Sequence, residues 1–177
     1  MADDHPARVA SIAAALEDLG RAPVLVGGMA LVVLGSRRVT RDFDLVIADP
    51  GDQLAAVVRV LYRERLHLAA RIDRDGHVVA TITNGRVAAA RLRIDRPHSA
   101  TFFDETDGLR VDLLFDFPIS ARTLAADAVR VRLGEHSLAV ASEARLLELK
   151  RLAAASRDAP GDAEDIRFLE RRVRRPT

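Results

Sequence analysis

The sequence lacks several residue types, and each absence narrows what the protein can be. It has no cysteine and no tryptophan, one tyrosine, and one lysine among its 27 basic residues. Without cysteine, disulfide bonds and cysteine–zinc sites are excluded. No apolar run reaches the roughly 18 residues of a membrane span, and the first residues are acidic where a signal peptide would be basic. We therefore expect a cytoplasmic protein with no membrane partner.

Aromatic residues and excess positive charge are also scarce. Aromatic side chains make up 4% of the chain, and its formal net charge is +1. Few bases could stack on so few rings, and no overall positive potential would attract nucleic acid. These counts disfavour broad recognition of single-stranded RNA. The five histidines are scattered along the chain, so we expect no histidine metal site.

The chain does have enough apolar residues for a core, placed at alternating helical and strand spacing. Its 177 residues, 49% of them hydrophobic, suit a single domain. The spacing predicts helices at 7–19, 28–34, 54–65, 142–156 and 162–174, and strands at 24–26, 42–47, 77–82, 86–94, 100–103, 109–115, 129–133 and 137–141. The dipeptide Asn84-Gly85 predicts a hairpin turn between the two strands beside it.

This order of elements predicts an α/β fold that borders on α+β, with a mixed β-sheet core flanked by helices. We expect residues 1–141 to form the core. We expect residues 142–177 to form a C-terminal helical pair that packs on the core, so that the whole is one compact domain.

Two aspartates, Asp42 and Asp44, stand one residue apart on the predicted strand 42–47. Residues i and i+2 of a strand project from the same face, so both carboxylates should point to one place. Two adjacent negative charges repel each other, and burial on an apolar strand adds a desolvation cost. A divalent cation would relieve both costs.

A third aspartate, Asp112, lies in the middle of the predicted strand 109–115, between valine and leucine. An isolated charge is costly in such a position. The ordinary interpretation is the solvated outer face of an edge strand. Because Asp42 and Asp44 already need a cation, the alternative is that Asp112 converges on the same ion.

The pair Gly27-Gly28 follows the apolar strand 24–26 and opens the next predicted helix. A helix start exposes unpaired backbone N–H groups, and the missing side chains let a phosphate approach the backbone. A glycine pair is often only a turn. Its position one short helix before Asp42 favours the phosphate interpretation.

Cations near these motifs could meet phosphates. Lys150 has apolar neighbours at helical spacing, so its ammonium either reaches outward to solvent or meets an anion. The loop before the aspartate pair contains Arg38 and Arg41 beside Arg37. These arginines could bind a nucleotide or an acceptor, or they could neutralise the aspartate pair when no metal is bound.

Together the motifs resemble the signature of the DNA polymerase beta-like nucleotidyltransferase superfamily. That signature is a hydrophobic residue before Gly-Gly or Gly-Ser, an Asp-x-Asp strand and an acid on a later strand, here Val26-Gly27-Gly28, Asp42-Phe43-Asp44 and Asp112. The longer stretch 26–45 is similar to minimal bacterial members, above all AbiEii-like toxins. Their C-terminal part often has a lysine-bearing helix followed by spaced aspartates, here Lys150, Asp162 and Asp165.

The resemblance implies transfer of a nucleoside monophosphate from ATP or another triphosphate to a hydroxyl acceptor, with release of pyrophosphate. Asp42 and Asp44 would hold two Mg²⁺ ions, with Mn²⁺ as the alternative metal, and Asp112 would complete the site. Asp112 would also orient or deprotonate the attacking hydroxyl. The phosphates would lie against the backbone of Gly27 and Gly28. Their charge would be balanced by Arg38, Arg41 and Lys150.

The acceptor and the class of protein stay open at this point. A toxin of a toxin–antitoxin system would modify tRNA or a protein and have a cognate antitoxin as partner. An antibiotic-modifying enzyme would act on an aminoglycoside or lincosamide hydroxyl. Two other classes compete with a transferase: a non-catalytic nucleotide-binding module of the same fold, and a metal-dependent phosphohydrolase or nuclease.

Overall fold

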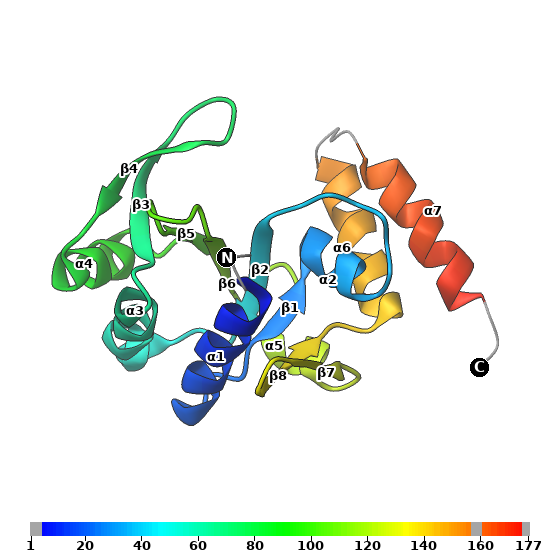
Figure 1. Ribbon diagram of the computed structural model, residues 1–177, viewed down its shortest axis with the longest axis horizontal. Helices are drawn as coiled ribbons and strands as arrows, with labels where there is room; N and C mark the ends of the chain where they lie inside the picture. The colour runs from blue at the N-terminus through cyan, green and yellow to red at the C-terminus, as the bar shows by residue number, and fades with distance from the viewer. Residues whose placement is uncertain (1–4, 157–160, 175–177) are drawn as a thin grey trace.

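The computed structural model describes residues 5–156 and 161–174 (Figure 1). Along the chain the elements are α1 (His5–Asp18), β1 (Val24–Val26), α2 (Gly27–Val33), β2 (Asp42–Ile47), the 3₁₀ turn η1 (Gly51–Gln53), α3 (Leu54–Arg63), β3 (His67–Ile72), β4 (Val78–Ile82), α4 (Gly85–Asp95), β5 (Ser99–Phe103), β6 (Arg110–Phe115), α5 (Ala121–Ala125), β7 (Val129–Leu133), β8 (His136–Val140), α6 (Glu143–Ser156) and α7 (Asp162–Val173). None of the helices within these residues is long and apolar enough to span a membrane.

The strands form one mixed sheet in the order β4-β3-β5-β6-β2-β1-β8-β7. Strand β2 lies near the middle, parallel to β6 and antiparallel to β1. Figure 1 shows α3 and α4 toward one end of the molecule and the paired helices α6 and α7 toward the other. This mixed sheet flanked by helices confirms the predicted fold class. The division at residue 141 stays a prediction.

The core forms where strand alternation turns apolar side chains to one face. On β2, Phe43, Leu45 and Ile47 are fully buried, while Asp42 and Asp44 project from the opposite face. Val46 shares the face of the aspartates and is also buried. The two carboxylates therefore lie at the open end of a strand whose remaining length is covered.

The predicted hairpin at Asn84-Gly85 is wrong. Residues 85–95 form helix α4, and the Asn84 side chain caps its first turn by accepting from the Arg86 and Val87 amides at 3.0 and 3.3 Å. Asparagine serves as a helix N-cap as readily as a turn residue, and an alanine-rich segment favours helix.

The true hairpin in this region lies earlier in the chain. Strand β3, which the apolar pattern does not predict, pairs with β4 across the turn 73–77. The other predicted strands and helices match the observed ones to within a few residues.

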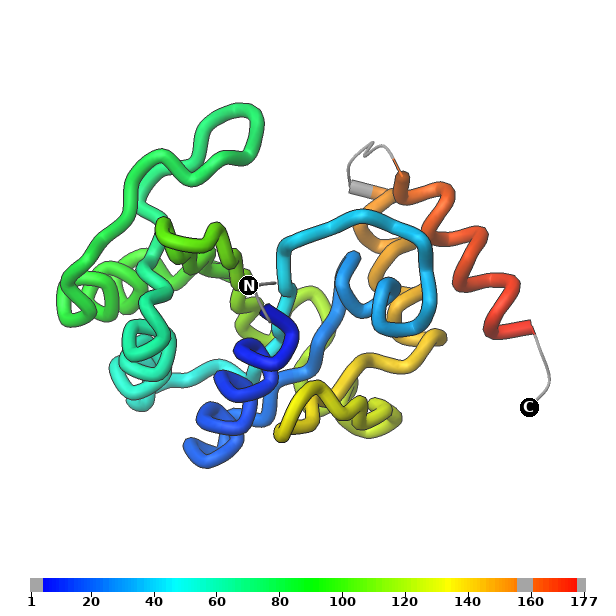
Figure 2. Tube along the Cα trace, viewed as in Figure 1, coloured from blue at the N-terminus to red at the C-terminus, as the bar shows by residue number. Residues whose placement is uncertain are grey.

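The loop 34–41 arches from the end of α2 to the start of β2, as Figure 2 shows. The glycine pair at the start of α2 and the aspartate pair at the start of β2 are therefore separated in the chain by α2 and this loop alone.

Candidate active site

Strand β1 places the glycine pair directly beside the aspartate pair. Strands β1 and β2 are antiparallel, with Val26 opposite Asp44, so the turn at Gly27 lies against the Asp44 side chain. Gly27 has φ +68°, and a Cβ there would lie 1.9 Å from Asp44 Oδ2. Only glycine accepts this backbone angle without strain while leaving room for the carboxylate. The structure therefore gives Gly27 the role of making space for Asp44.

The third aspartate joins the pair through the register of β2 and β6. Asp44 lies opposite Asp112, and Asp42 lies opposite Arg110, on two parallel strands. Strand β6 is paired on both sides, by β5 and β2, so the edge-strand interpretation of Asp112 is wrong. Three acids and one arginine thus project from one patch of the sheet. We call Asp42, Asp44, Arg110 and Asp112 the sheet cluster.

The electrostatics of the sheet cluster centre on Asp44. Burial raises the pKa of Asp44 to about 7, and repulsion from Asp112 and Asp42 adds to the rise. Arg110 and Lys150 act against it but do not cancel it. A carboxylate that resists ionisation near neutral pH gains most from a bound cation, because the cation removes both the desolvation cost and the repulsion.

Arg110 is a site residue that the sequence motifs do not identify. Its guanidinium engages both oxygens of Asp112, with Nε 3.3 Å from Oδ1 and Nη2 3.1 Å from Oδ2. Burial alone would lower the pKa of Arg110, but the surrounding carboxylates, led by Asp112, raise it. The signal in the sequence is the spacing Arg-x-Asp on one strand, which places both side chains on the same face.

The three predicted ligands are not gathered into a compact group in this conformation. Within the described residues, the only Asp, Glu or His triplet whose ligand atoms all lie within 4.8 Å of one another is Asp73, Asp75 and His77. Asp112 instead directs both oxygens to Arg110. The residue types at Asp42, Asp44 and Asp112 fit a divalent cation, but Asp112 must turn from Arg110 to contribute.

The triplet of Asp73, Asp75 and His77 forms the exposed turn between β3 and β4. Asp73 Oδ1 accepts from the amides of Asp75 and His77 at 3.0 and 2.8 Å. These bonds explain the cluster as a stable turn. The cluster could also hold a metal ion, which runs against the expectation of no histidine metal site. The spacing Asp-x-Asp-x-His is its signal in the sequence.

The second glycine makes room for an arginine. A Cβ on Gly28 would lie 2.8 Å from Arg38 Nε, so the guanidinium fills the space above the glycine. Arg38 pairs with Asp165 on α7. Arg41, the other predicted cation of this loop, is exposed. Neither is among the cations that most affect the Asp44 pKa, and that role belongs to Arg110 and Lys150.

Lys150 is held by two acids of α7. Its ammonium donates to Asp162 at 3.0 Å and forms an ion pair with Asp165 at 2.7 Å, and all three side chains are nearly buried. Asp165 thus bridges Lys150 and Arg38. We call Arg38, Lys150, Asp162 and Asp165 the helix cluster. The contact of Lys150 with phosphate stays a prediction.

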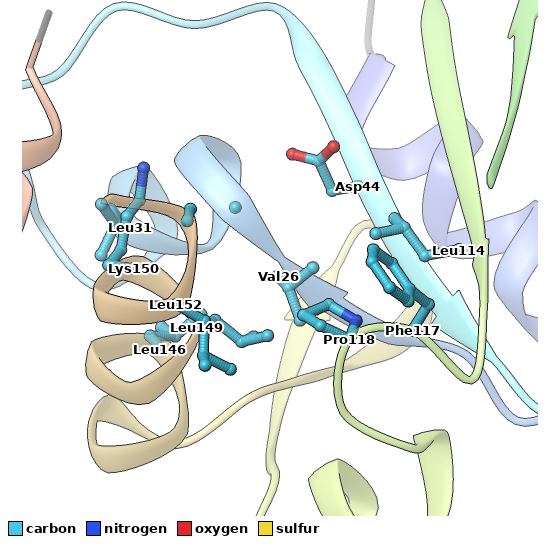
Figure 3. Close-up of a pocket in the computed structure, with 12 residues that line it drawn as sticks. Val26, Leu31, Asp44, Leu114, Phe117, Pro118, Leu146, Leu149, Lys150 and Leu152 are labelled. Atoms are coloured by element: carbon cyan, nitrogen blue, oxygen red, sulfur yellow. The ribbon is translucent and has the colours of Figure 1, made fainter. Parts of the chain in front are cut away.

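A cavity of about 500 Å³ lies between the sheet and α6, with Asp44 and Lys150 on its wall. Figure 3 shows Asp44 on β2 and Lys150 on α6 on opposite sides of the opening. The rest of the wall is apolar apart from the Gly27 backbone: Val26, Leu31, Leu114, Phe117, Pro118, Leu146, Leu149, Leu152 and Ala153. Its size suits a small organic group.

Comparisons with known proteins agree with this fold. No family model matches the chain, and no curated protein sequence does. Among solved structures, the chain is similar to an antigenic nucleotidyltransferase-like protein from Paracoccidioides brasiliensis, with a TM-score of 0.59 and 17% sequence identity. The match covers 95% of this chain and 74% of that chain. The chain therefore shares the fold of a nucleotidyltransferase-like protein.

Proposed function

We propose that the protein is a divalent-metal-dependent nucleotidyltransferase. The observation that carries the proposal is the register of β2 and β6, which sets Asp44 opposite Asp112 with Asp42 on the same face. The raised pKa of Asp44 supports it, because a cluster of three acids with one arginine lacks positive charge.

Asp42, Asp44 and Asp112 would hold Mg²⁺, or Mn²⁺ in its place. The metal would stabilise the attacking and leaving oxygens during displacement at the α-phosphate. Asp112 would also orient the acceptor hydroxyl and accept its proton. Because Gly27 has no Cβ, the Asp44 carboxylate can occupy the space beside it. Lys150, on the wall of the same cavity, would attract the triphosphate.

The apolar cavity would take either the base of the nucleotide or the acceptor. Phe117 offers an aromatic face, and the leucines of α6 offer an apolar wall. Such a wall suits a flat or apolar group better than an aminoglycoside, which needs many hydrogen-bonding partners. A protein or tRNA could be the acceptor only if its hydroxyl reaches this opening. The protein would then be a toxin with an antitoxin partner.

The test is release of pyrophosphate. The protein is incubated with each nucleoside triphosphate, Mg²⁺ and a cell extract as the acceptor source, with the α-phosphate labelled. We expect label on an acceptor and pyrophosphate in the medium, both lost with EDTA or in Asp44→Asn. Release of inorganic phosphate, or cut nucleic acid, would instead indicate a phosphohydrolase or nuclease. Full activity of Asp44→Asn would overturn the proposed site.

The Arg110–Asp112 pair favours one alternative, a nucleotide-binding module that does no chemistry. A guanidinium that stays on Asp112 would keep that carboxylate from a metal. In that case the triphosphate would bind with Mg²⁺, but neither pyrophosphate nor labelled acceptor would form.

A further inference from the structure

The geometry points to Arg110 as a latch: it competes with a divalent cation for Asp112 and at the same time ties down the tip of the β3–β4 hairpin. Arg110 is thus a positioning residue that acts through Asp112. The inference rests on the proposed cation site at Asp42, Asp44 and Asp112, but it concerns when that site is open.

The first half of the latch is the pair with Asp112. Two nitrogens of the guanidinium reach two oxygens of the carboxylate, at 3.3 and 3.1 Å, and the side chains are only 23% and 16% exposed. Such two-point pairing is the strongest geometry open to arginine. It commits both oxygens of Asp112 to Arg110, although the strand register places Asp112 opposite Asp44.

The second half is the hairpin tip. Arg110 Nη1 donates to the Gly76 carbonyl oxygen at 3.1 Å. The tip is a well-formed turn, in which the Asp73 backbone amide also donates to the His77 carbonyl oxygen at 2.9 Å. One side chain therefore connects a turn 34 residues away in the chain to the third acid of the sheet cluster.

Both contacts use the same guanidinium, so they should change together. A cation that takes Asp112 removes the main partner of Arg110 and adds positive charge beside it. Arg110 then moves, and the Gly76 contact breaks. Cation binding and tip release are therefore linked. The factor by which the bound cation weakens the Arg110–Gly76 contact equals the factor by which that contact weakens cation binding.

The first test is calorimetric binding of Mn²⁺ to the nucleotide-free protein. We expect Arg110→Gln to bind Mn²⁺ at least about tenfold more tightly than the wild type, because the competing charged hydrogen bonds are gone. The matched control is Arg130→Gln, which removes a strand arginine at the far edge of the sheet. The gain should vanish when Asp44→Asn is added, which separates this site from Mn²⁺ bound at the Asp73 turn.

The second test is hydrogen exchange across residues 73–77. Mn²⁺ should speed exchange of this tip in the wild type by several fold, whereas Mn²⁺ bound at the turn itself would slow it. In Arg110→Gln the tip should exchange fast from the start, with no further gain from Mn²⁺. In Asp44→Asn the tip should stay slow with Mn²⁺ present.

The latch is overturned if Arg110→Gln and the wild type bind Mn²⁺ with affinities within about twofold, or if the tip of the wild type exchanges equally with and without Mn²⁺. It is also overturned if neither protein binds Mn²⁺ through Asp44. These results are separate from those of the transferase proposal. Mn²⁺-driven release of the tip without pyrophosphate formation would support the latch and contradict the proposed nucleotidyltransferase activity. Pyrophosphate formation with an unchanged Mn²⁺ affinity in Arg110→Gln would support the activity and contradict the latch.

Discussion

The sheet cluster and the helix cluster are both partly buried groups of charges, and each has one residue on the cavity wall, Asp44 and Lys150. They differ in charge balance. The helix cluster has two cations and two acids, and each ammonium or guanidinium reaches a carboxylate. The sheet cluster has three acids and one arginine, and the pKa of Asp44 rises to about 7 as a result of burial and repulsion.

This difference in charge balance is the reason for proposing the cation site at the sheet cluster. Burial makes any charge costly, and a partner of opposite sign offsets the cost. In the helix cluster the partners are all supplied by the chain, so it can serve to hold α6 against α7. In the sheet cluster the chain supplies too little positive charge, and a cation from solution would complete it. We therefore assign the proposed cation to the cluster whose charges are unbalanced.

Asp44→Asn should produce the largest effect on activity. We expect nucleotide transfer to fall at least about a thousandfold, because the proposed cation, which would stabilise the transition state, would lose a central ligand. The fold should persist, since the change removes a repelled charge. Transfer rates and circular dichroism of the same preparation check both points. Loss of the fold would mean that Asp44 is a structural residue.

Lys150→Met should produce the largest effect on stability. It leaves Asp162 and Asp165 without their shared ammonium, and we expect a loss of about 3–5 kcal/mol in the free energy of unfolding. The control is Arg151→Met on the next residue, whose exposed pair with Glu170 should matter by less than about 1 kcal/mol. Urea denaturation measures both. Unchanged stability would contradict the structural role of these ion pairs. A raised KM for the triphosphate in Lys150→Met would separately support the proposed phosphate contact.

Gly27→Ala should disturb the sheet cluster through the backbone. The left-handed φ alone costs about 1–3 kcal/mol for alanine, and the new Cβ collides with the Asp44 carboxylate. Gly20→Ala is the matched control, because Gly20 has φ +70° and nothing within 4 Å of a Cβ. We expect both variants to lose stability and only Gly27→Ala to lose activity. Equal activity in the two would show that Asp44 can sit elsewhere.

The charge imbalance of the sheet cluster should also have a smaller effect, on how the free energy of unfolding changes with pH. The folded protein holds a proton on Asp44 up to about pH 7, while the ordinary pKa is 3.8. The stability contributed by this proton is complete below the ordinary value and is lost as the pH rises through about 7. In metal-free protein, Asp44→Asn should therefore flatten the fall in unfolding free energy between about pH 4 and pH 7.

Urea denaturation at points across this range, with EDTA present, measures that slope. The control is Asp52→Asn, which changes an exposed turn acid. A fall in stability that is as steep in Asp44→Asn as in the wild type would show that other groups cause it.

The sequence alone predicts the parts of the site that follow from strand alternation. The spacing of Asp42 and Asp44, and the face of Asp112, are period-two patterns that need no partner strand. The pairing of Asp44 with Asp112 could not be predicted, because register depends on how β2 and β6 pack together. The same holds for Arg110, whose contact with Gly76 depends on a hairpin that the apolar pattern misses.

Two other features show where local patterns are ambiguous. Asn84-Gly85 fits a hairpin turn and a helix start equally well, and the helix wins because Ala88, Ala89 and Leu92 pack in the core. Lys150 has apolar neighbours along its own helix, and its acidic partners lie on the next one. Tertiary contacts decide both cases, so the sequence could only pose the alternatives.

The most direct test of the account is whether the sheet cluster binds a metal–nucleotide complex. Calorimetry with Mg²⁺ and non-hydrolysable analogues of the four nucleoside triphosphates would compare the wild type, Asp44→Asn and Asp52→Asn. We predict binding by the wild type and by Asp52→Asn, and an affinity at least about tenfold weaker for Asp44→Asn. Equal binding by the wild type and Asp44→Asn, or binding by neither, would contradict the claim that charge imbalance marks this site.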